Sequence, residues 1–213
     1  MPRIAVVYYS STGNVHMLAE AAAGAAEEAG AQVRLLRIPP LPAETVVPGT
    51  EDAVAAHAEA VRSTVPEVSL DDLLWADGIL IGSPVRFGLP AAPVSVFLDS
   101  TAPVSIPGRL ADKVVSAFTS GSAPHGGQET TLLALHNAVC HWGSLIVANG
   151  SSDEVLFRPE NGNPYGTGSV TRNRPGNVHE DNVAAVAFQA RRVVEVATVV
   201  TAGKAAVERA VAA

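Results

Sequence analysis

The sequence predicts an α/β fold, a doubly wound parallel sheet covered by helices on both faces, in a single domain spanning residues 1–213. Two observations carry this prediction. Apolar segments of strand length alternate along the chain with segments of helical periodicity, and parallel neighbours in a sheet need such helical crossovers. Neither an internal repeat nor a large shift in composition divides the 213 residues, so we expect one core.

Five segments have the composition of strands. Most are nearly continuous runs of valine, leucine and isoleucine, which is typical of strands buried on both faces, whereas the second alternates in character. In chain order they cover residues 3–9, 32–38, 77–83, 113–120 and 144–150.

Helical periodicity follows the first strand. Val15, Leu18 and Ala22 recur on one face, and Gly30 stands where such a helix would end. Further helices are predicted over residues 51–63 and 130–141.

The last helix is predicted to begin at Asn177, with Glu180 three residues on as its capping-box partner. Two other segments contain too much proline or glycine for regular structure. Residues 39–50 are a proline-rich loop, and residues 159–176 form a loop too long for an ordinary connection.

Composition excludes several classes of function. The net charge of −7 and the lack of a basic stripe argue against nucleic acid as a partner. No run approaches the roughly 20 apolar residues of a membrane span, and the N-terminus lacks a secretion signal, so we expect a cytoplasmic protein without membrane contact. The single cysteine, Cys140, fits a reducing compartment, and we expect it to serve packing.

Two kinds of catalytic site are also absent from the pattern. The six histidines are scattered without the clustered spacing of a metal centre, so no metal is expected. The chain has no GxSxG nucleophile elbow, which argues against a hydrolase of that type.

Three loops at predicted strand ends, residues 10–15, 84–88 and 119–127, are the candidate site, because doubly wound sheets bind ligands at these ends. The first loop, "SSTGN", places hydroxyl and amide groups at a helix N-terminus, where backbone N–H groups and the helix dipole favour an anion. It contains no lysine or arginine, which favours a phosphate monoester held by neutral donors. The alternative is a plain N-cap, although one hydroxyl would suffice for a cap.

Five motifs together resemble the WrbA family of flavodoxin-like NAD(P)H:quinone oxidoreductases. They are "YYSSTGN", "GSPVRFG", "TSGSAPHGGQET", "CHWG" and "NPYG", in this order and spacing over nearly the whole chain. The resemblance implies a flavodoxin-like three-layer α/β/α sandwich with a five-stranded parallel sheet of order 2-1-3-4-5. It also implies FMN as cofactor, NADH or NADPH as electron donor, two-electron reduction of quinones by a ping-pong hydride-transfer mechanism, and a homotetramer.

The resemblance assigns roles to individual residues. The FMN phosphate is expected at Ser10, Ser11, Thr12, Gly13, Asn14 and Val15. The flavin ring is expected against Pro84, Val85, Arg86, Phe87, Gly88, Thr119, Ser120, Gly121, Ser122 and Gly126. Phe87, Ser105 and Tyr165 are expected in the substrate pocket.

Two residues are candidates for catalysis. The resemblance brings His141 close to the ring, where it could protonate a quinone oxygen or donate a hydrogen bond. Arg86, or nearby backbone N–H groups, could stabilise the negative charge of reduced flavin. The sequence departs from the family at two positions, since Thr12 and Ser105 stand where aromatic residues are usual.

Two other functions remain open from the sequence. One is a flavodoxin-type electron carrier that shuttles single electrons between proteins. The other is an FMN reductase that supplies reduced flavin to a partner oxygenase.

Overall fold

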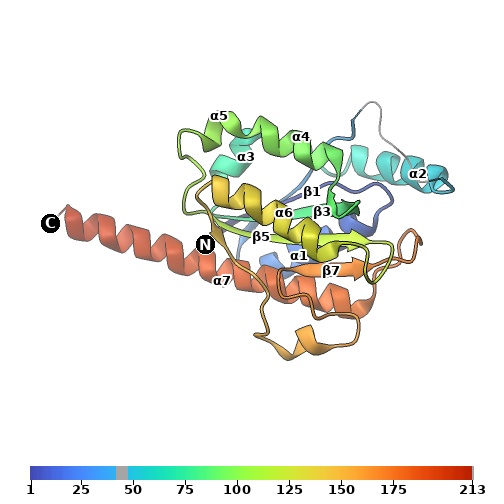
Figure 1. The fold of residues 1–213 in the computed structure, drawn as a ribbon. Coiled ribbons are helices and arrows are strands. Elements are labelled where there is room, and N and C mark those ends of the chain that lie inside the picture. Colours follow the sequence, from blue (N-terminus) through green and yellow to red (C-terminus); the bar gives the residue numbers. More distant parts are fainter. Residues whose placement is uncertain (42–47, 213) are drawn as a thin grey trace.

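The computed structural model describes residues 1–41 and 48–212 (Figure 1). Its centre is a parallel sheet in which the strands follow the order β2-β1-β3-β5-β6, with β7 also beside β5. The predicted doubly wound order 2-1-3-4-5 is therefore confirmed. The parallel strands are β1 (Arg3–Tyr8), β2 (Gln32–Arg37), β3 (Gly78–Arg86), β5 (Val114–Gly121), β6 (Leu145–Ile146) and β7 (Thr167–Val170). A short strand, β4 (Leu89–Pro90), turns back antiparallel on the end of β3.

Alternation along the strands divides the core into two apolar layers. On β1, Val6 contributes to one buried cluster and Val7 to the other, because successive side chains leave a strand on opposite faces. The register keeps each cluster continuous, since Val6 pairs with Leu80 of β3 and Val7 with Ile81. Because both faces of the sheet are apolar, both need helices to exclude water. The nearly continuous apolar runs in the sequence predicted this arrangement.

Helices cover both layers (Figure 1). The cluster that contains Val6 packs under α1 (Asn14–Glu28) and α7 (Glu180–Val211). The cluster that contains Val7 packs under the other helices, which are α3 (Leu70–Trp75), α4 (Ala92–Ser100), α5 (Ala102–Ser105) and α6 (Gln128–His141). The amphipathic helix α2 (Glu51–Arg62) buries Val61 and lies beside the start of α1.

The fifth strand differs from the prediction over residues 144–150. β6 pairs with β5 over two residues, and the strand position is resumed by β7, which lies inside the predicted long loop 159–176. Between them the chain leaves the sheet through a short 3-10 helix, Glu154–Phe157. Beyond the apolar run, Gly150 adopts a left-handed backbone, with φ 60°, as the chain leaves the sheet.

Gln189 of α7 fills the interruption in the fifth strand. Its Nε2 donates to the Ala117 carbonyl of β5 at 2.7 Å and to Ser116 Oγ at 2.7 Å. Its Oε1 accepts from Thr167 N, the first residue of β7, at 3.0 Å. Ser116 Oγ in turn donates to the Val147 carbonyl, just after β6. One buried amide thus satisfies backbone groups that an unbroken strand would otherwise pair.

The predicted start of the last helix is wrong by three residues. α7 begins at Glu180, and its N-cap is His179, whose Nδ1 accepts from Asp181 N. Glu180 is therefore the first helical residue and not a capping-box partner. Within the described residues, no helix is long and apolar enough to cross a membrane.

Candidate functional site

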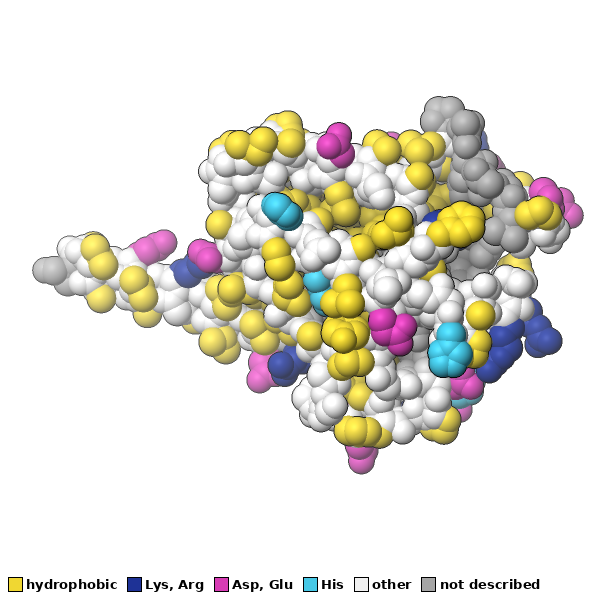
Figure 2. All heavy atoms as spheres, in the orientation of Figure 1, with side chains coloured by type: hydrophobic (Ala, Val, Ile, Leu, Met, Phe, Trp, Pro, Cys, Tyr) yellow, Lys and Arg dark blue, Asp and Glu magenta, His cyan; other side chains and the backbone are white. Residues whose placement is uncertain are grey.

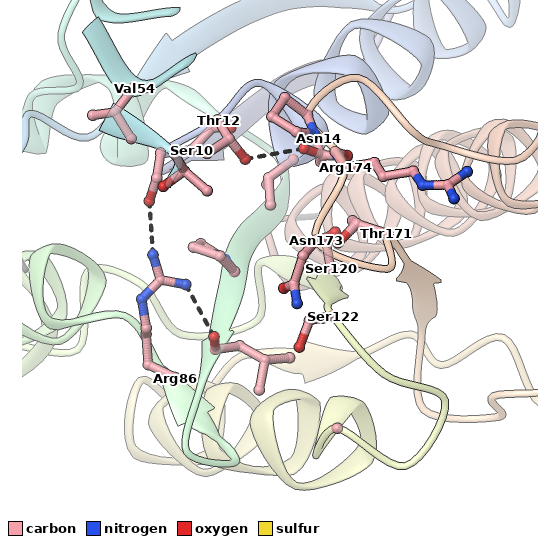
Figure 3. A pocket seen from close by; sticks show the side chains of 18 of the residues that line it. Ser10, Thr12, Asn14, Val54, Arg86, Ser120, Ser122, Thr171, Asn173 and Arg174 are labelled. Atoms are coloured by element: carbon pink, nitrogen blue, oxygen red, sulfur yellow. Dashed lines mark hydrogen bonds between the residues drawn. The ribbon is translucent and has the colours of Figure 1, made fainter. Parts of the chain in front are cut away.

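A cavity of about 390 Å³ lies where β1, β3 and β5 end, at the switch point of the sheet (Figure 3). Its volume is within the usual range for small-molecule sites. Each of the three predicted loops contributes to its wall. The predicted residues that line it are Ser10, Ser11, Thr12, Asn14, Val15, Pro84, Val85, Arg86, Phe87, Ser120, Gly121, Ser122 and Gly126.

The first loop is held by its own polar groups. Gly13 adopts a left-handed backbone, with φ 91°, and its N–H donates to Ser10 Oγ at 3.1 Å. Thr12 Oγ1 donates to Asn14 Oδ1 at 3.0 Å, and Asn14 Nδ2 donates to the Arg174 carbonyl at 3.1 Å. Both polar atoms of the Asn14 side chain are thus engaged within the protein. This arrangement makes Asn14 a brace between two loops.

The alternative role of these hydroxyl groups is a plain N-cap, in which a side-chain oxygen accepts a hydrogen bond from a backbone N–H in the first turn of the helix. α1 follows Gly13 without a side-chain cap in the part of the chain that the structure describes. The N-cap position is thus a glycine, which offers no side-chain oxygen of the kind that ordinarily caps a helix start. The first turn of α1 directs its backbone N–H groups towards the cavity end of the helix, which is the geometry of an anion site.

The second loop connects to the first through Arg86 (Figure 3). Arg86 Nη2 donates to Ser11 Oγ at 2.8 Å, and its Nη1 donates to the Val85 carbonyl at 3.1 Å. Phe87 follows in a left-handed conformation, with φ 53° and a fully exposed side chain. Such strain in a bulky residue is typical of functional loops. The loop places a cation and an aromatic ring at the rim of the cavity.

The third loop depends on two residues with structural roles. Thr119 is buried and does not line the cavity, because its Oγ1 donates to the Ser83 carbonyl at 2.6 Å and ties β5 to β3. Gln128 is a residue that the sequence did not single out. Its Nε2 donates to the Ala123 carbonyl and its Oε1 accepts from Gly126 N, so it closes the loop from within.

A fourth wall of the cavity comes from residues 171–175, after β7. None of these residues was among the site residues predicted from the sequence. Thr171 N and Arg172 N donate to the carbonyls of Gly121 and Ser122, which attaches this segment to the third loop. Figure 3 shows the Asn173 side chain directed into the cavity near Ser120 and Ser122, whereas the Arg174 side chain points away. The available signal was weak: an Asn-Arg-Pro-Gly turn, with Asn173 suited to its φ of 56°.

Other predicted residues lie outside the cavity wall of the chain. Gly13 and Gly88 support the loops from behind, and an added Cβ on Gly88 would meet Thr130 Oγ1 at 2.8 Å. His141 is the exposed last residue of α6, a helix about 20 Å long whose first residue is beside the cavity. Ser105 lies in α5, and Tyr165 lies in the turn before β7.

Cys140, which we expected to serve packing, is exposed. Among the described residues, no cluster of three or more histidine, cysteine, aspartate or glutamate side chains has the geometry to hold a metal ion.

The fold and cavity define a flavodoxin-like α/β protein with a cavity lined by a polar loop at its switch point. Solved structures share this fold. A WrbA-like flavodoxin from Agrobacterium tumefaciens gives a TM-score of 0.64 at 23% identity, covering 93% of this chain and 98% of that one. A flavodoxin from the domain Archaea gives 0.59 at 17% identity, covering 92% and 99%.

The chain belongs to the NADPH-dependent FMN reductase family, whose model matches residues 2–152. Curated relatives are similar over nearly their whole length. A protein from Deinococcus radiodurans named NAD(P)H dehydrogenase (quinone) is 40% identical over 193 residues, which cover 91% of this chain and 94% of the relative. One of the same name from Acidithiobacillus ferrooxidans is 38% identical, covering 92% and 97%. The predicted resemblance to the WrbA family is confirmed.

Proposed function

We propose that the protein is an FMN-dependent oxidoreductase that reduces quinones by two electrons with NADH or NADPH. The observation that carries this proposal is the cavity at the switch point, with neutral hydrogen-bond donors at the start of α1 and an apolar, arginine-containing wall along β3. The names of the relatives, NAD(P)H dehydrogenase (quinone), support the same activity.

The donor set fits a flavin mononucleotide. The backbone N–H groups at the start of α1, with Ser10 and Thr12, would hold the phosphate. Pro84, Val85 and Phe87 offer the flat apolar surface that an isoalloxazine ring needs.

Two further polar side chains of the wall, Arg86 and Asn173, have proposed roles. Arg86, oriented by Ser11, would stabilise negative charge at the pyrimidine edge of the ring. Asn173 would donate to or accept from the ribityl chain or ring edge, since its side chain faces the cavity. His141 is too far along α6 to act within the same chain, so the proposal gives it no step there.

Bound FMN would supply the redox chemistry, accepting a hydride from nicotinamide and passing it on to the quinone. The cavity would admit first the nicotinamide and then the quinone, each positioned by the wall that contains Val85, Arg86 and Phe87. Since one cavity serves both, the first product leaves before the second substrate enters, and ping-pong kinetics follow.

We further propose that the protein assembles as a homotetramer in the cytoplasm. Large apolar side chains exposed at Phe87, Leu89 and Ile106 support association between copies. The single cysteine is consistent with a reducing compartment.

The absorption spectrum and steady-state kinetics of the purified protein test the proposed activity. We expect a yellow protein that keeps its FMN through gel filtration and is bleached by NADH or NADPH. Initial rates with benzoquinone should give parallel double-reciprocal lines. Flavin that exchanges freely would favour an FMN reductase. A lack of NAD(P)H oxidation with quinone, together with a stable coloured intermediate during dithionite titration, would favour the electron carrier.

A further inference from the structure

A histidine lies beside the first loop and is not among the residues that line the cavity. His57 belongs to α2, and its Nδ1 lies 3.6 Å from where a Cβ on Gly13 would be. Val54, about one turn earlier on the same helix, lines the cavity itself. The imidazole therefore lies beside the loop to which we assign the FMN phosphate, at the open side of Gly13.

The ring of His57 lies beside a second histidine. Its centroid is 5.2 Å from that of His16 on α1. Both nitrogens of His16 are engaged, Nδ1 with Tyr8 Oη at 2.6 Å and Nε2 with the Glu20 carboxylate at 3.3 Å. Within the part of the chain that the structure describes, the His57 ring has no recorded hydrogen bond. His57 thus has a nitrogen available for protonation.

Other charged groups face His57 from the neighbouring strands and from its own helix. Arg37, Arg62 and Glu67 line a second cavity together with His57 and Tyr8. Arg37 and Glu67 are paired at 2.8 Å, so their charges largely offset one another. Glu20 is the acidic group on the side of His16.

The proposed phosphate site lacks charge within its own loop. Residues 10–15 contain no lysine or arginine, and the Arg174 side chain points away from the cavity (Figure 3). A phosphate monoester carries about −1.5 to −2 charges at pH 7, whereas a helix N-terminus offers only about half a positive charge. Arg86 reaches the loop at Ser11 Oγ, 2.8 Å away, but the proposed function assigns its charge to the ring, so a bound phosphate favours an additional cation nearby.

His57 is uncharged at neutral pH in the protein without an anion. Burial, and then repulsion by a protonated His16, lower the pKa of His57 to about 4. Burial also lowers the pKa of His16, against an opposing effect of Glu20. A dianion placed on the other side of Gly13 acts in the opposite direction and favours the protonated imidazole.

We propose that His57 is a positioning residue of the flavin site, which takes up a proton as the FMN phosphate binds and supplies the positive charge that the first loop lacks. The inference rests on the proposed assignment of this loop to the phosphate. It acts through the loop backbone at Gly13, without direct contact with the redox-active ring.

Proton uptake on binding makes the affinity for FMN depend on pH. Because the cofactor-bound protein holds a proton that the free protein lacks, FMN affinity rises as the pH falls from 8 towards 6.5. Below a pH of about 6 the phosphate itself takes up a proton and the gain is reversed. Riboflavin has no phosphate, so its affinity stays constant over the same range.

The test measures flavin affinity by fluorescence quenching with apoprotein at pH 8.0, 7.0 and 6.5. Wild type is expected to bind FMN several-fold more tightly at pH 6.5 than at pH 8.0. His57→Gln keeps a polar side chain of similar reach without a titrating charge, and should lose this rise. His179→Gln, at an exposed histidine that lines neither cavity, is the matched control and should behave as wild type.

A second measurement does not depend on a variant. Imidazole NMR should show the pKa of His57 rising on FMN binding and staying unchanged on riboflavin binding. An unchanged His57 pKa with FMN, or equal pH dependence in wild type and His57→Gln, would overturn the inference while leaving the flavin site intact. Failure to bind either flavin at any pH would instead overturn the proposed function.

Discussion

At the scale of single residues, many polar groups around the cavity position other groups. Asn14 braces the first loop against residue 174, and Thr119 fastens β5 to β3. Arg86 is oriented by the hydroxyl of Ser11. Such bonds fix the loops before a ligand arrives, which lowers the entropy cost of binding.

The buried His136 should make the folded protein less stable at acidic pH. It is buried in α6, its Nε2 has no hydrogen-bond partner among the described residues, and burial lowers its pKa. The unfolded chain therefore binds a proton more readily than the folded one, so the free energy of unfolding decreases as the pH falls below about 6.5.

His136→Leu should reduce that decrease, measured by urea unfolding at pH 7 and pH 5. The exposed His125→Leu is the control and should retain the wild-type decrease. Equal losses in wild type and His136→Leu would contradict the role of burial.

The site could be predicted from the sequence where its chemistry is dense and local. The first loop places three hydroxyl groups and an amide around one glycine, and its cavity position follows from the fold class. Asn173 could not be found in this way, because it reaches the cavity through tertiary contacts of the segment after β7. The position of His141 was also beyond the sequence, since a motif does not give the direction in which its helix carries it.

At the scale of elements, the interrupted fifth strand is the main departure from the simple alternating pattern. The apolar run 144–150 predicted one strand, yet only Leu145–Ile146 pairs with β5 before the chain leaves. β7 returns to the same edge about 20 residues later and brings the fourth wall of the cavity with it. The sequence pattern did not predict that β7 pairs with β5, because Thr167–Val170 is short and lies among turn residues.

Gln189 joins the two parts of the fifth strand, so its replacement should lower the stability of the protein. Replacing it with leucine removes the partners of the Ala117 carbonyl and of Thr167 N, which are both buried. Unsatisfied buried groups cost about 1–3 kcal/mol each, so we expect a loss of roughly 2–4 kcal/mol in the free energy of unfolding.

Urea unfolding measures this cost, and Thr198→Val on the same helix is the control. That change removes one hydrogen bond within α7, from Thr198 Oγ1 to the Val194 carbonyl, and should cost less than about 1 kcal/mol. If the two variants lost the same stability, Gln189 would not hold the two parts of the strand together.

At the scale of the whole molecule, apolar side chains are exposed on the face formed by α4, α6 and the Phe87 loop (Figure 2). Leu89, Val96 and Leu133 are exposed on this side. A chain with a net charge of −7 resists nonspecific association, which favours a defined contact over aggregation.

For the homotetramer that we propose, sedimentation should give a mass near four times 21.9 kDa. Leu133→Glu should weaken this assembly by burying a charge, whereas Val211→Glu, at the projecting end of α7, should leave it unchanged. A single species of 21.9 kDa that retains FMN and activity would contradict the assembly.

The length of α7 has a practical consequence. The helix runs 32 residues and carries the C-terminus beyond the body of the protein, at the end opposite to the strand ends that form the cavity (Figure 1). Lys204 forms an exposed ion pair of 3.2 Å with Asp112, seven residues before the helix ends at Val211. A linker joined to the C-terminus would hold the protein on an electrode or a carrier bead with its cavity facing the solution.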